Sequence, residues 1–163
     1  MQRSGHKSVT HHVIGIDQEI VQDFTGLQAA LAQSGISPQE QIAAVIENDL
    51  SESVLNERSV RVWYAFRGES RNHPGIGRYS DTRDNRLRDL MFNAFESIVH
   101  KIDFPDPSVV ARDATHGSLA LLEGMWTDYL LHPKSFNRKS AKRIIFRFLG
   151  SLFPSSFSEN GPN

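Results

Sequence analysis

Cysteine is absent from the 163 residues, which excludes disulfide bonds and metal sites built on thiolates. No apolar run approaches the roughly 18–20 residues that span a membrane, and the polar segment from Met1 to Lys7 lacks the apolar core of a secretory signal. The net charge of −1 gives the chain no excess of one sign for coating nucleic acid or membranes. No segment alternates with the period of a β-strand. We therefore expect an all-α, cytoplasmic protein that makes no membrane contact.

Apolar residues recur at three- and four-residue steps along most of the chain, which is the period of an α-helix. The pattern predicts a bundle of about five to six helices. They are expected at residues 13–34, 38–50, 52–69 and 76–102, and as a pair between residues 109 and 153 with a hinge at 131–134. Ser37, Pro38 and Glu40 supply an N-cap, a proline at the first helical position and a capping-box acid. Proline and two glycines in segment 72–77 predict a turn there.

The last two predicted helices carry more apolar surface than one neighbour can cover. A row of small residues on the first of them allows another helix to approach closely. Two such helices from each subunit suit a four-helix interface about a two-fold axis, so we expect a homodimer. A helical hairpin buried inside one subunit is the alternative. The residues assigned to the interface are Gly117, Leu121, Gly124, Ile144, Ile145 and Phe148.

Aromatic residues from three predicted helices would meet inside a bundle and form either plain core or the wall of a cavity. A quaternary ammonium group over an aromatic face gains about 0.5–2 kcal/mol. Glu123 lies on the most apolar helix, where its carboxylate is a counter-charge in a pocket, an exposed flank residue or one half of a salt bridge across the dimer. The residues that we assign to a ligand cavity are Trp63, Phe66, Phe95, Glu123, Trp126 and Tyr129.

No pattern of catalytic or metal-binding residues stands out. The seven histidines are scattered among different elements rather than grouped at ligand spacing, so we expect no metal site and no cofactor. The nucleophile elbow Gly-x-Ser-x-Gly does not occur, and the neighbours His116 and Ser118 do not face each other on a helix. We therefore expect that this protein is not an enzyme.

Six cations lie between residues 134 and 147, and no acid occurs between Asp128 and Glu159. A basic helix can bind phosphates through counterion release, which would make this segment a nucleic-acid-binding module. A solvated face of a C-terminal helix is the favoured interpretation, because lysine and arginine are common there. The cations are Lys134, Arg138, Lys139, Lys142, Arg143 and Arg147.

Two stretches resemble a known family. Residues 60–66, with His73-Pro74 and residues 83–95, are similar to the middle of the regulatory domain of TetR-family repressors, and most to the choline-responsive BetI type. Residues 114–126 resemble the penultimate helix of that group, with its acid-Gly-apolar-Trp centre. The resemblance implies a domain that dimerises through its last two helices and holds an effector cavity in each subunit. Together with the aromatic residues, it implies a choline-like cation as the effector.

The family pattern includes a module that this sequence lacks. Its members read the operator with an N-terminal helix-turn-helix of about fifty residues, whereas here only residues 8–12 resemble the end of a recognition helix. We expect residues 1–12 to be disordered or a remnant of a truncated DNA-binding region, and 154–163 to be a flexible tail. Residues 13–153 then form the ligand-binding and dimerisation domain of a transcriptional regulator, which meets operator DNA only through the absent module. A partner that forms heterodimers with a full-length regulator is the alternative.

Overall fold

The computed structural model describes residues 35–70 and 74–163, and the helix expected at 13–34 lies outside them. Five helices and one two-stranded hairpin make up the described part of the chain. The helices are α2 (Pro38–Asp49), α3 (Glu57–Ser70), α4 (Pro74–Val99), α5 (Pro107–Leu131) and α6 (Arg138–Leu152), and the strands are β1 (Phe157–Ser158) and β2 (Gly161–Pro162). The prediction of an all-α fold class with about five helices is confirmed, and the short β1–β2 hairpin is the exception.

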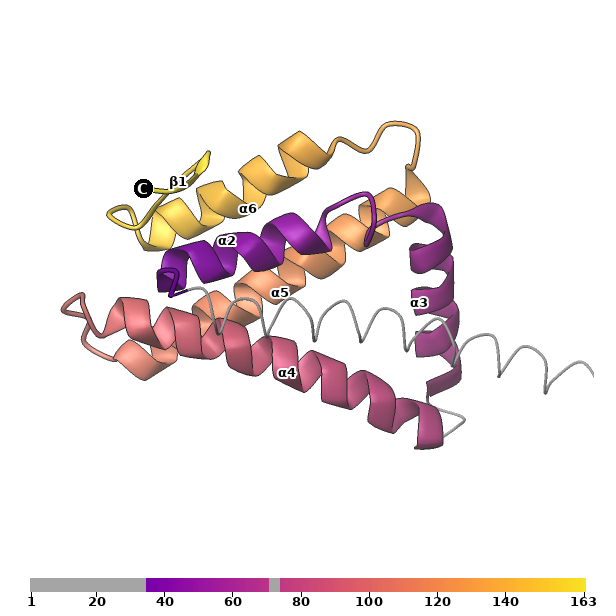
Figure 1. Cartoon of the computed structure of the whole chain (residues 1–163), viewed down its shortest axis with the longest axis horizontal. Coiled ribbons are helices and arrows are strands. Elements are labelled where there is room, and N and C mark those ends of the chain that lie inside the picture. The colour runs from indigo at the N-terminus through magenta and orange to yellow at the C-terminus, as the bar shows by residue number, and fades with distance from the viewer. Residues whose placement is uncertain (1–34, 71–73) are drawn as a thin grey trace, which may run out of the picture.

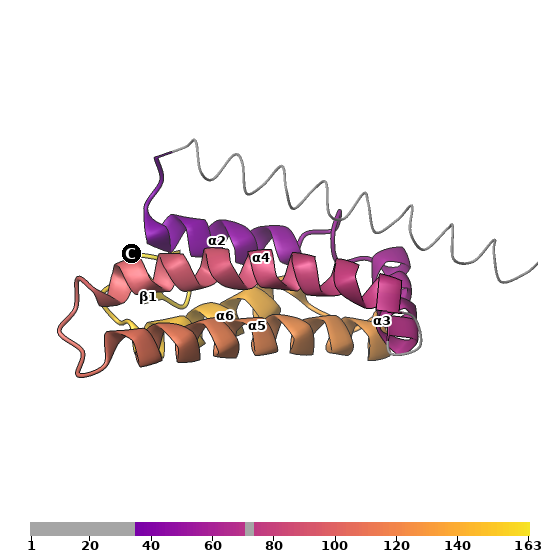
Figure 2. The ribbon, with the colours of Figure 1, turned by 90° about the horizontal axis from the view of Figure 1, so that it is seen from below.

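Helices α2, α4, α5 and α6 run roughly along one direction, and α3 crosses one end of them (Figure 1). Viewed from below, α2 and α4 lie above α5 and α6, with α3 seen almost end-on at the same end of the bundle (Figure 2). Helix α4 packs most extensively on α5, and α5 also contacts α3 and α6. Helix α5 therefore contacts both the crossing helix α3 and the last helix α6.

Apolar side chains from every described helix meet in one core. Its largest fully buried members include Phe95 of α4, Ile145 of α6 and Phe153, which follows α6. The rings of Phe95 and Phe153 stack with centroids 5.7 Å apart, and Phe104 meets Phe153 edge to face at 6.1 Å. Because aromatic rings bury large areas, this cluster joins α4 to the end of α6 and contributes strongly to stability.

The helix starts follow from side chains that satisfy free backbone N–H groups. Ser37 caps α2, and Glu40 completes the predicted capping box by accepting the Ser37 N–H at 2.8 Å. Asp106 caps α5 and Asn137 caps α6 in the same way. Asn56 accepts a hydrogen bond from the Ser59 N–H at 3.0 Å, and α3 accordingly begins at Glu57 rather than at the predicted residue 52.

Two further segments differ from the sequence expectation. Helix α4 begins at Pro74, so Pro74 and the residues that follow it are helical rather than a turn. Proline fits there because its missing N–H has no helical partner at that position. Residues 154–163, expected as a flexible tail, instead form the β1–β2 hairpin, in which Phe157 pairs with Pro162. The Phe157 side chain is buried in the main core, which explains why the segment packs.

One arginine ties the start of α6 to the end of α2. The Arg138 Nη1 donates to the carbonyl of Leu50 at 2.8 Å, and its Nη2 donates to that of Leu55 at 2.6 Å. A longer contact of 3.4 Å reaches the Ser51 carbonyl. A cation suits this place because the last carbonyls of a helix carry partial negative charge. The tie fixes the C-terminal end of α2, which supplies one side chain to the cavity described next.

Candidate functional site

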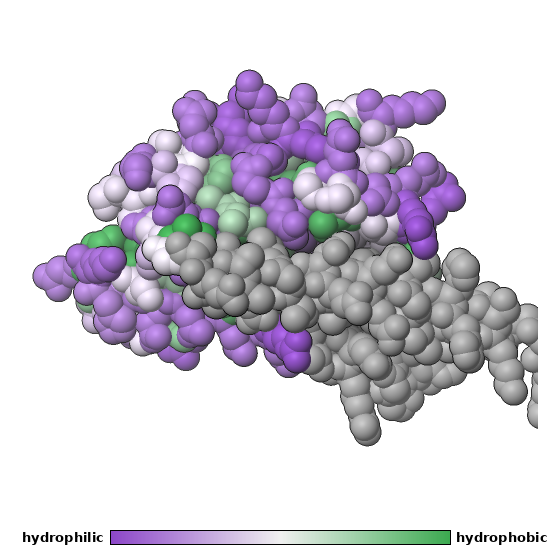
Figure 3. All heavy atoms as spheres, in the orientation of Figure 1, coloured by the Kyte–Doolittle hydropathy of each residue, from purple (hydrophilic) through white to green (hydrophobic). Residues whose placement is uncertain are grey.

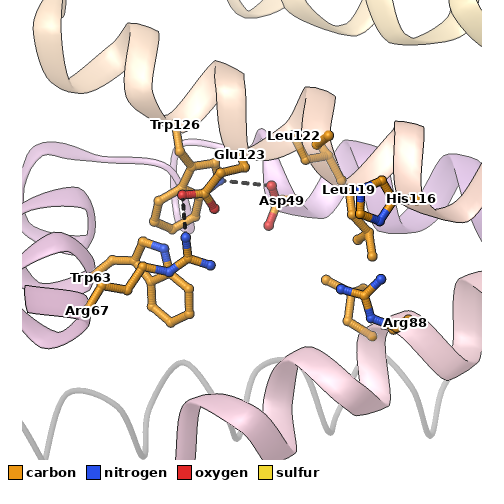
Figure 4. Close-up of a pocket in the computed structure, with 11 residues that line it drawn as sticks. Asp49, Trp63, Arg67, Arg88, His116, Leu119, Leu122, Glu123 and Trp126 are labelled. Atoms are coloured by element: carbon orange, nitrogen blue, oxygen red, sulfur yellow. Dashed lines mark hydrogen bonds and ion pairs between the residues drawn. The ribbon is translucent and has the colours of Figure 1, made fainter. Parts of the chain in front are cut away.

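A cavity of about 220 Å³ lies where α2, α3, α4 and α5 meet. This volume is below the range of roughly 300–1,000 Å³ that is typical for drug-sized ligands, so the cavity suits a small molecule. Its wall combines two indole rings and several aliphatic side chains with charged groups of both signs (Figure 4). The lining residues are Asp49, Trp63, Arg67, Leu87, Arg88, His116, Leu119, Ala120, Leu122, Glu123 and Trp126.

Two tryptophans and one aspartate form the inner wall. Trp63 of α3 and Trp126 of α5 are both buried, and their rings meet edge to face with centroids 6.3 Å apart. The Trp126 Nε1–H donates to Oδ2 of Asp49, the last residue of α2, at 2.8 Å. A hydrogen bond to a charged acceptor is stronger than a neutral one, so this contact orients the indole ring. The inner wall is therefore both aromatic and acidic.

The side chain of Arg67 also lines the cavity, next to Trp63 and Glu123. The Arg67 Nη1 is 2.8 Å from Oε1 of Glu123, and the two groups form an ion pair between α3 and α5. The Arg67 guanidinium carbon also lies 4.9 Å from the centroid of the Trp63 ring. Figure 4 shows the guanidinium between the indole ring and the carboxylate. One cation thus interacts with an aromatic face and a carboxylate at once.

Tyr64 adds a second polar contact between α3 and α5. Its hydroxyl lies 2.6 Å from Oγ1 of Thr127 and donates to Oε1 of Glu123 over 3.4 Å. Burial of the hydroxyl raises the pKa of Tyr64 above its usual value, and the negative charge of Glu123 acts in the same direction. Glu123 is therefore the common acceptor for two side chains of α3.

The cavity also has a basic end. Arg88 of α4 lies across from His116 and Leu119 of α5 (Figure 4). Both Arg88 and His116 are exposed at the surface. The acidic and aromatic wall and this basic end therefore give the cavity two regions of different charge.

A second feature of α5 and α6 is an exposed apolar surface. Among the described residues, every large hydrophobic side chain that is markedly exposed lies on one of these two helices. Ile144, near the middle of α6, is 46% exposed. These exposed residues lie along the length of both helices, from the first turn of α5 to the last turn of α6, so the two helices predicted to form the interface carry exposed apolar side chains without forming one compact patch. The residues concerned are Val109, Leu130, Leu131, Ile144 and Leu152.

The C-terminal domain of BetI-type transcriptional repressors matches residues 38–154. The chain belongs to this family. The match includes all five described helices, the cavity and the exposed apolar surface of α5 and α6. The resemblance seen in the sequence is confirmed, and the expectation that the protein is not an enzyme agrees with a family of transcriptional regulators.

Individual relatives agree with the family match. The regulator BetI of Stenotrophomonas maltophilia (strain R551-3) is 27% identical over 118 residues, which cover 72% of this chain and 57% of that protein. BetI 2 of Chromohalobacter salexigens is 26% identical over 137 residues, covering 83% and 63%. A crystal structure of a protein from Pseudomonas aeruginosa PAO1 shares the fold, with a TM-score of 0.69 and 20% identity over 90% of this chain and 73% of that one. The chain thus spans about 57–63% of these two BetI relatives.

The BetI-type domain brings only part of the predicted ligand set together. Trp63, Glu123 and Trp126 line the cavity. Phe66 is buried behind it and stacks on Trp63 with centroids 6.2 Å apart. Phe95, contrary to the prediction, is a core residue stacked on Phe153 and does not line the cavity.

Tyr129 also lies away from the cavity. Its ring packs against Phe136 at 5.4 Å, and the Arg138 guanidinium carbon lies 5.4 Å from its centroid. Tyr129 therefore belongs to the α5–α6 connection and the Arg138 tie.

Most charged residues of the cavity were not predicted. Asp49, Arg67, Arg88 and His116 all line it, and three of these four have no neighbour in sequence that would mark them as site residues. Arg67 could have been predicted, because it follows Trp63 by four residues and therefore lies on the same face of the helix. Asp49 could not be found in this way, since its partner Trp126 is 77 positions away.

The predicted interface residues fall into two groups. Gly117 and Phe148 contact each other inside the subunit, where a Cβ atom on Gly117 would lie 2.6 Å from the ring. Ile145 is fully buried in the subunit core, so it offers no surface to a partner. Gly124 has open space around it, and Leu121 and Phe148 are only partly buried. The helical hairpin within one subunit thus accounts for part of the predicted set, and Ile144 and Gly124 remain accessible.

Half of the basic cluster is engaged within the subunit. Arg138 binds backbone carbonyls, Lys142 pairs with Glu47, and Arg147 pairs with Glu159 at 2.6 Å. Hydrophilic residues cover most of the upper edge in Figure 3, where Figure 1 places α6. These contacts support the interpretation of a solvated face over a nucleic-acid-binding helix.

Metal sites and membrane-spanning helices can be assessed in residues 35–70 and 74–163. Within them, no three histidine or carboxylate side chains stand close enough together to bind a metal ion. No helix in the same ranges is both long and apolar enough to cross a membrane.

Proposed function

We propose that this chain supplies the effector-binding and dimerisation region of a BetI-type transcriptional regulator, and that it controls operator binding allosterically. The cavity lined by Trp63, Trp126, Asp49 and Glu123 is the proposed effector site. The observation that carries the proposal is the pairing of indole rings with carboxylates in one small cavity of a domain that matches this family. Such a wall attracts a small cation of the choline type, because both the ring faces and the carboxylates favour positive charge.

Helix α5 gives this proposal a route from ligand to dimer. One face of α5 lines the cavity through His116, Glu123 and Trp126. Gly124, next to Glu123, lies on open surface of the same helix. A ligand that shifts α5 would therefore change the surface offered to a second subunit. Allosteric couplings are typically about 1–3 kcal/mol, which is enough to alter operator affinity fivefold or more.

Ligand binding can be measured without a label. The sequence contains two tryptophans, and both line the cavity. We expect choline to change the intrinsic fluorescence saturably, and calorimetry to give the same dissociation constant. Asp49→Asn should weaken binding, because it removes one carboxylate from the wall but keeps an acceptor for the Trp126 N–H. Absence of any saturable signal with small cations would contradict the proposed effector site.

The proposed interface has its own test. Gly124→Arg places a long charged side chain on the open surface of α5 and should convert a dimer into particles of about 18.4 kDa in sedimentation. Gly68→Arg is the matched control, because Gly68 of α3 also has no atom within 4 Å of a Cβ position but lies outside α5 and α6. A wild-type chain that sediments as a monomer at tens of micromolar would refute dimerisation through these helices.

Heterodimerisation with a full-length regulator is the second candidate function. The same exposed apolar surface on α5 and α6 supports it, since a related subunit would meet the same side chains. Co-expression with a full-length BetI regulator should then lower operator binding in a gel-shift assay, and Gly124→Arg should abolish the effect. Undiminished operator binding by the mixture would exclude this role.

A further inference from the structure

The cation site of the proposed effector cavity already contains a cation. Trp63 offers its ring face and Glu123 its carboxylate, and these are the two groups that a small cationic ligand needs. Arg67 uses both of them: its Nη1 is 2.8 Å from Glu123 Oε1, and its guanidinium carbon is 4.9 Å from the Trp63 centroid. The chain's own side chain therefore stands where the charged group of a ligand would bind (Figure 4).

We propose that Arg67 is an internal competitor, and that a cationic effector binds by displacing its guanidinium group from Trp63 and Glu123. This inference rests on the proposed effector site. The contact can open, because the side chains of Arg67 and Glu123 are 40% and 36% exposed and such pairs are held weakly. The measured affinity for a cation is then reduced by the fraction of molecules in which the arginine is bound.

Displacement of Arg67 also changes how α3 is held. Arg67 and Tyr64 both lie on α3 and both contact Glu123 of α5, while Tyr64 also contacts Thr127. A ligand that takes over the carboxylate removes the Arg67 contact and competes with the Tyr64 contact. Helix α3 crosses the end of the bundle, so its attachment to α5 becomes weaker when the ligand is bound (Figure 1). The exchange of one cation for another is thereby converted into a change in helix packing.

The opposite role for Arg67 is binding an anion directly. In that case a negatively charged ligand would pair with the guanidinium group, helped by Arg88 at the basic end of the cavity. The two roles predict effects of opposite sign when the arginine is removed. An internal competitor weakens cation binding, so its removal strengthens it. An anion-binding arginine strengthens ligand binding, so its removal weakens it.

The experiment compares Arg67→Met with Arg61→Met in the full chain. Arg61 lies on the same helix and forms an exposed ion pair with Glu57, so its replacement removes an equal charge outside the cavity. The probes are tetramethylammonium, the neutral tert-butanol and the anion trimethylacetate, which share similar size and shape. Dissociation constants are measured by calorimetry and by tryptophan fluorescence at constant ionic strength. Circular dichroism checks that each variant is folded, and Arg67→Gln serves if the methionine variant is not.

We expect Arg67→Met to bind tetramethylammonium about threefold to thirtyfold more tightly than wild type, as loss of one ion pair and one cation–aromatic contact implies. Arg61→Met should bind it as wild type does. The gain from Arg67→Met should be smaller for tert-butanol, which profits from the vacated space but has no charge to pair with the freed carboxylate of Glu123. Equal affinity of wild type and Arg67→Met for tetramethylammonium would overturn the competitor role while leaving the effector site intact. Trimethylacetate binding that is lost in Arg67→Met would overturn it in favour of an anion site. Failure of every probe to bind either protein would overturn both this inference and the proposed effector site.

Discussion

The substitution Arg138→Lys tests whether Arg138 stabilises the fold through its hydrogen bonds to backbone carbonyls. The guanidinium group makes two short hydrogen bonds, to the carbonyls of Leu50 and Leu55, and lies 5.4 Å from the Tyr129 centroid. Lysine keeps the positive charge but loses the planar fork, so it can satisfy only one of the two carbonyls well. Hydrogen bonds to charged groups contribute about 1.5–3 kcal/mol each. We expect Arg138→Lys to lower the free energy of unfolding by about 2–3 kcal/mol.

The matched control is Arg147→Lys on the same helix. The Arg147 side chain is 67% exposed and pairs with Glu159, which is also largely exposed. Surface ion pairs contribute about 0–1 kcal/mol, so the control should change stability by less than that. Urea denaturation followed by circular dichroism, at one fixed protein concentration, gives both values. In thermal unfolding the Arg138 variant should melt about 4–12 °C lower, from the usual scaling for domains of this size.

Equal effects of the two replacements, within about 0.5 kcal/mol, would refute this reasoning, because they would show that the carbonyl contacts of Arg138 contribute no more than a solvated ion pair. The comparison also bears on the basic cluster. If Arg138 served to bind nucleic acid instead, lysine would preserve most of its affinity for phosphate and leave stability unchanged.

Three further predictions concern packing and pH. Gly117→Ala should lower the free energy of unfolding by about 1 kcal/mol, because crowding against the Phe148 ring costs about 1–3 kcal/mol and the gain in helix propensity is about 1 kcal/mol. In a Phe148→Leu background the same change should stabilise the protein. If urea denaturation shows that the two substitutions have additive effects, crowding against Phe148 is not the cause. Hydrogen bonds from Ser37 lower the pKa of Glu40, so its stabilising contribution is present at neutral pH and lost as pH falls through the folded pKa, and Glu40→Gln should flatten acid denaturation curves. The raised pKa of Tyr64 means that stability falls as pH rises above the unfolded value near 10, and Tyr64→Phe should reduce this alkaline loss in melts recorded at increasing pH.

The helices were predictable because local signals define them. Periodic apolar residues and the capping box at Ser37 predict α2 closely, and the apolar period also predicts α5 and α6. The start of α4 was missed because proline breaks a helix interior but fits the first turn, and composition alone does not distinguish these positions. The β1–β2 hairpin was missed because two-residue strands have no detectable alternation and because the burial of Phe157 depends on tertiary packing in the core.

The cavity was predictable only through its aromatic residues. Trp63 and Trp126 stand out in a sequence with two tryptophans, and their helices were expected to meet. The side chains that set the charge of the cavity are ordinary surface types, and their role follows from tertiary contacts such as that between Asp49 and Trp126. Phe95 shows the reverse error, since an aromatic residue at helical spacing is equally consistent with core.

The close contact between Gly117 and Phe148 has a consequence for how subunits would rearrange. Absence of a side chain on Gly117 lets the ring lie against the α5 backbone, and the fit leaves little freedom for α6 to slide along α5. In a dimer built on these helices, each subunit would therefore contribute a rigid two-helix unit. A change of dimer geometry would then be a rotation of one helix pair against the other, with the spacing inside each pair preserved.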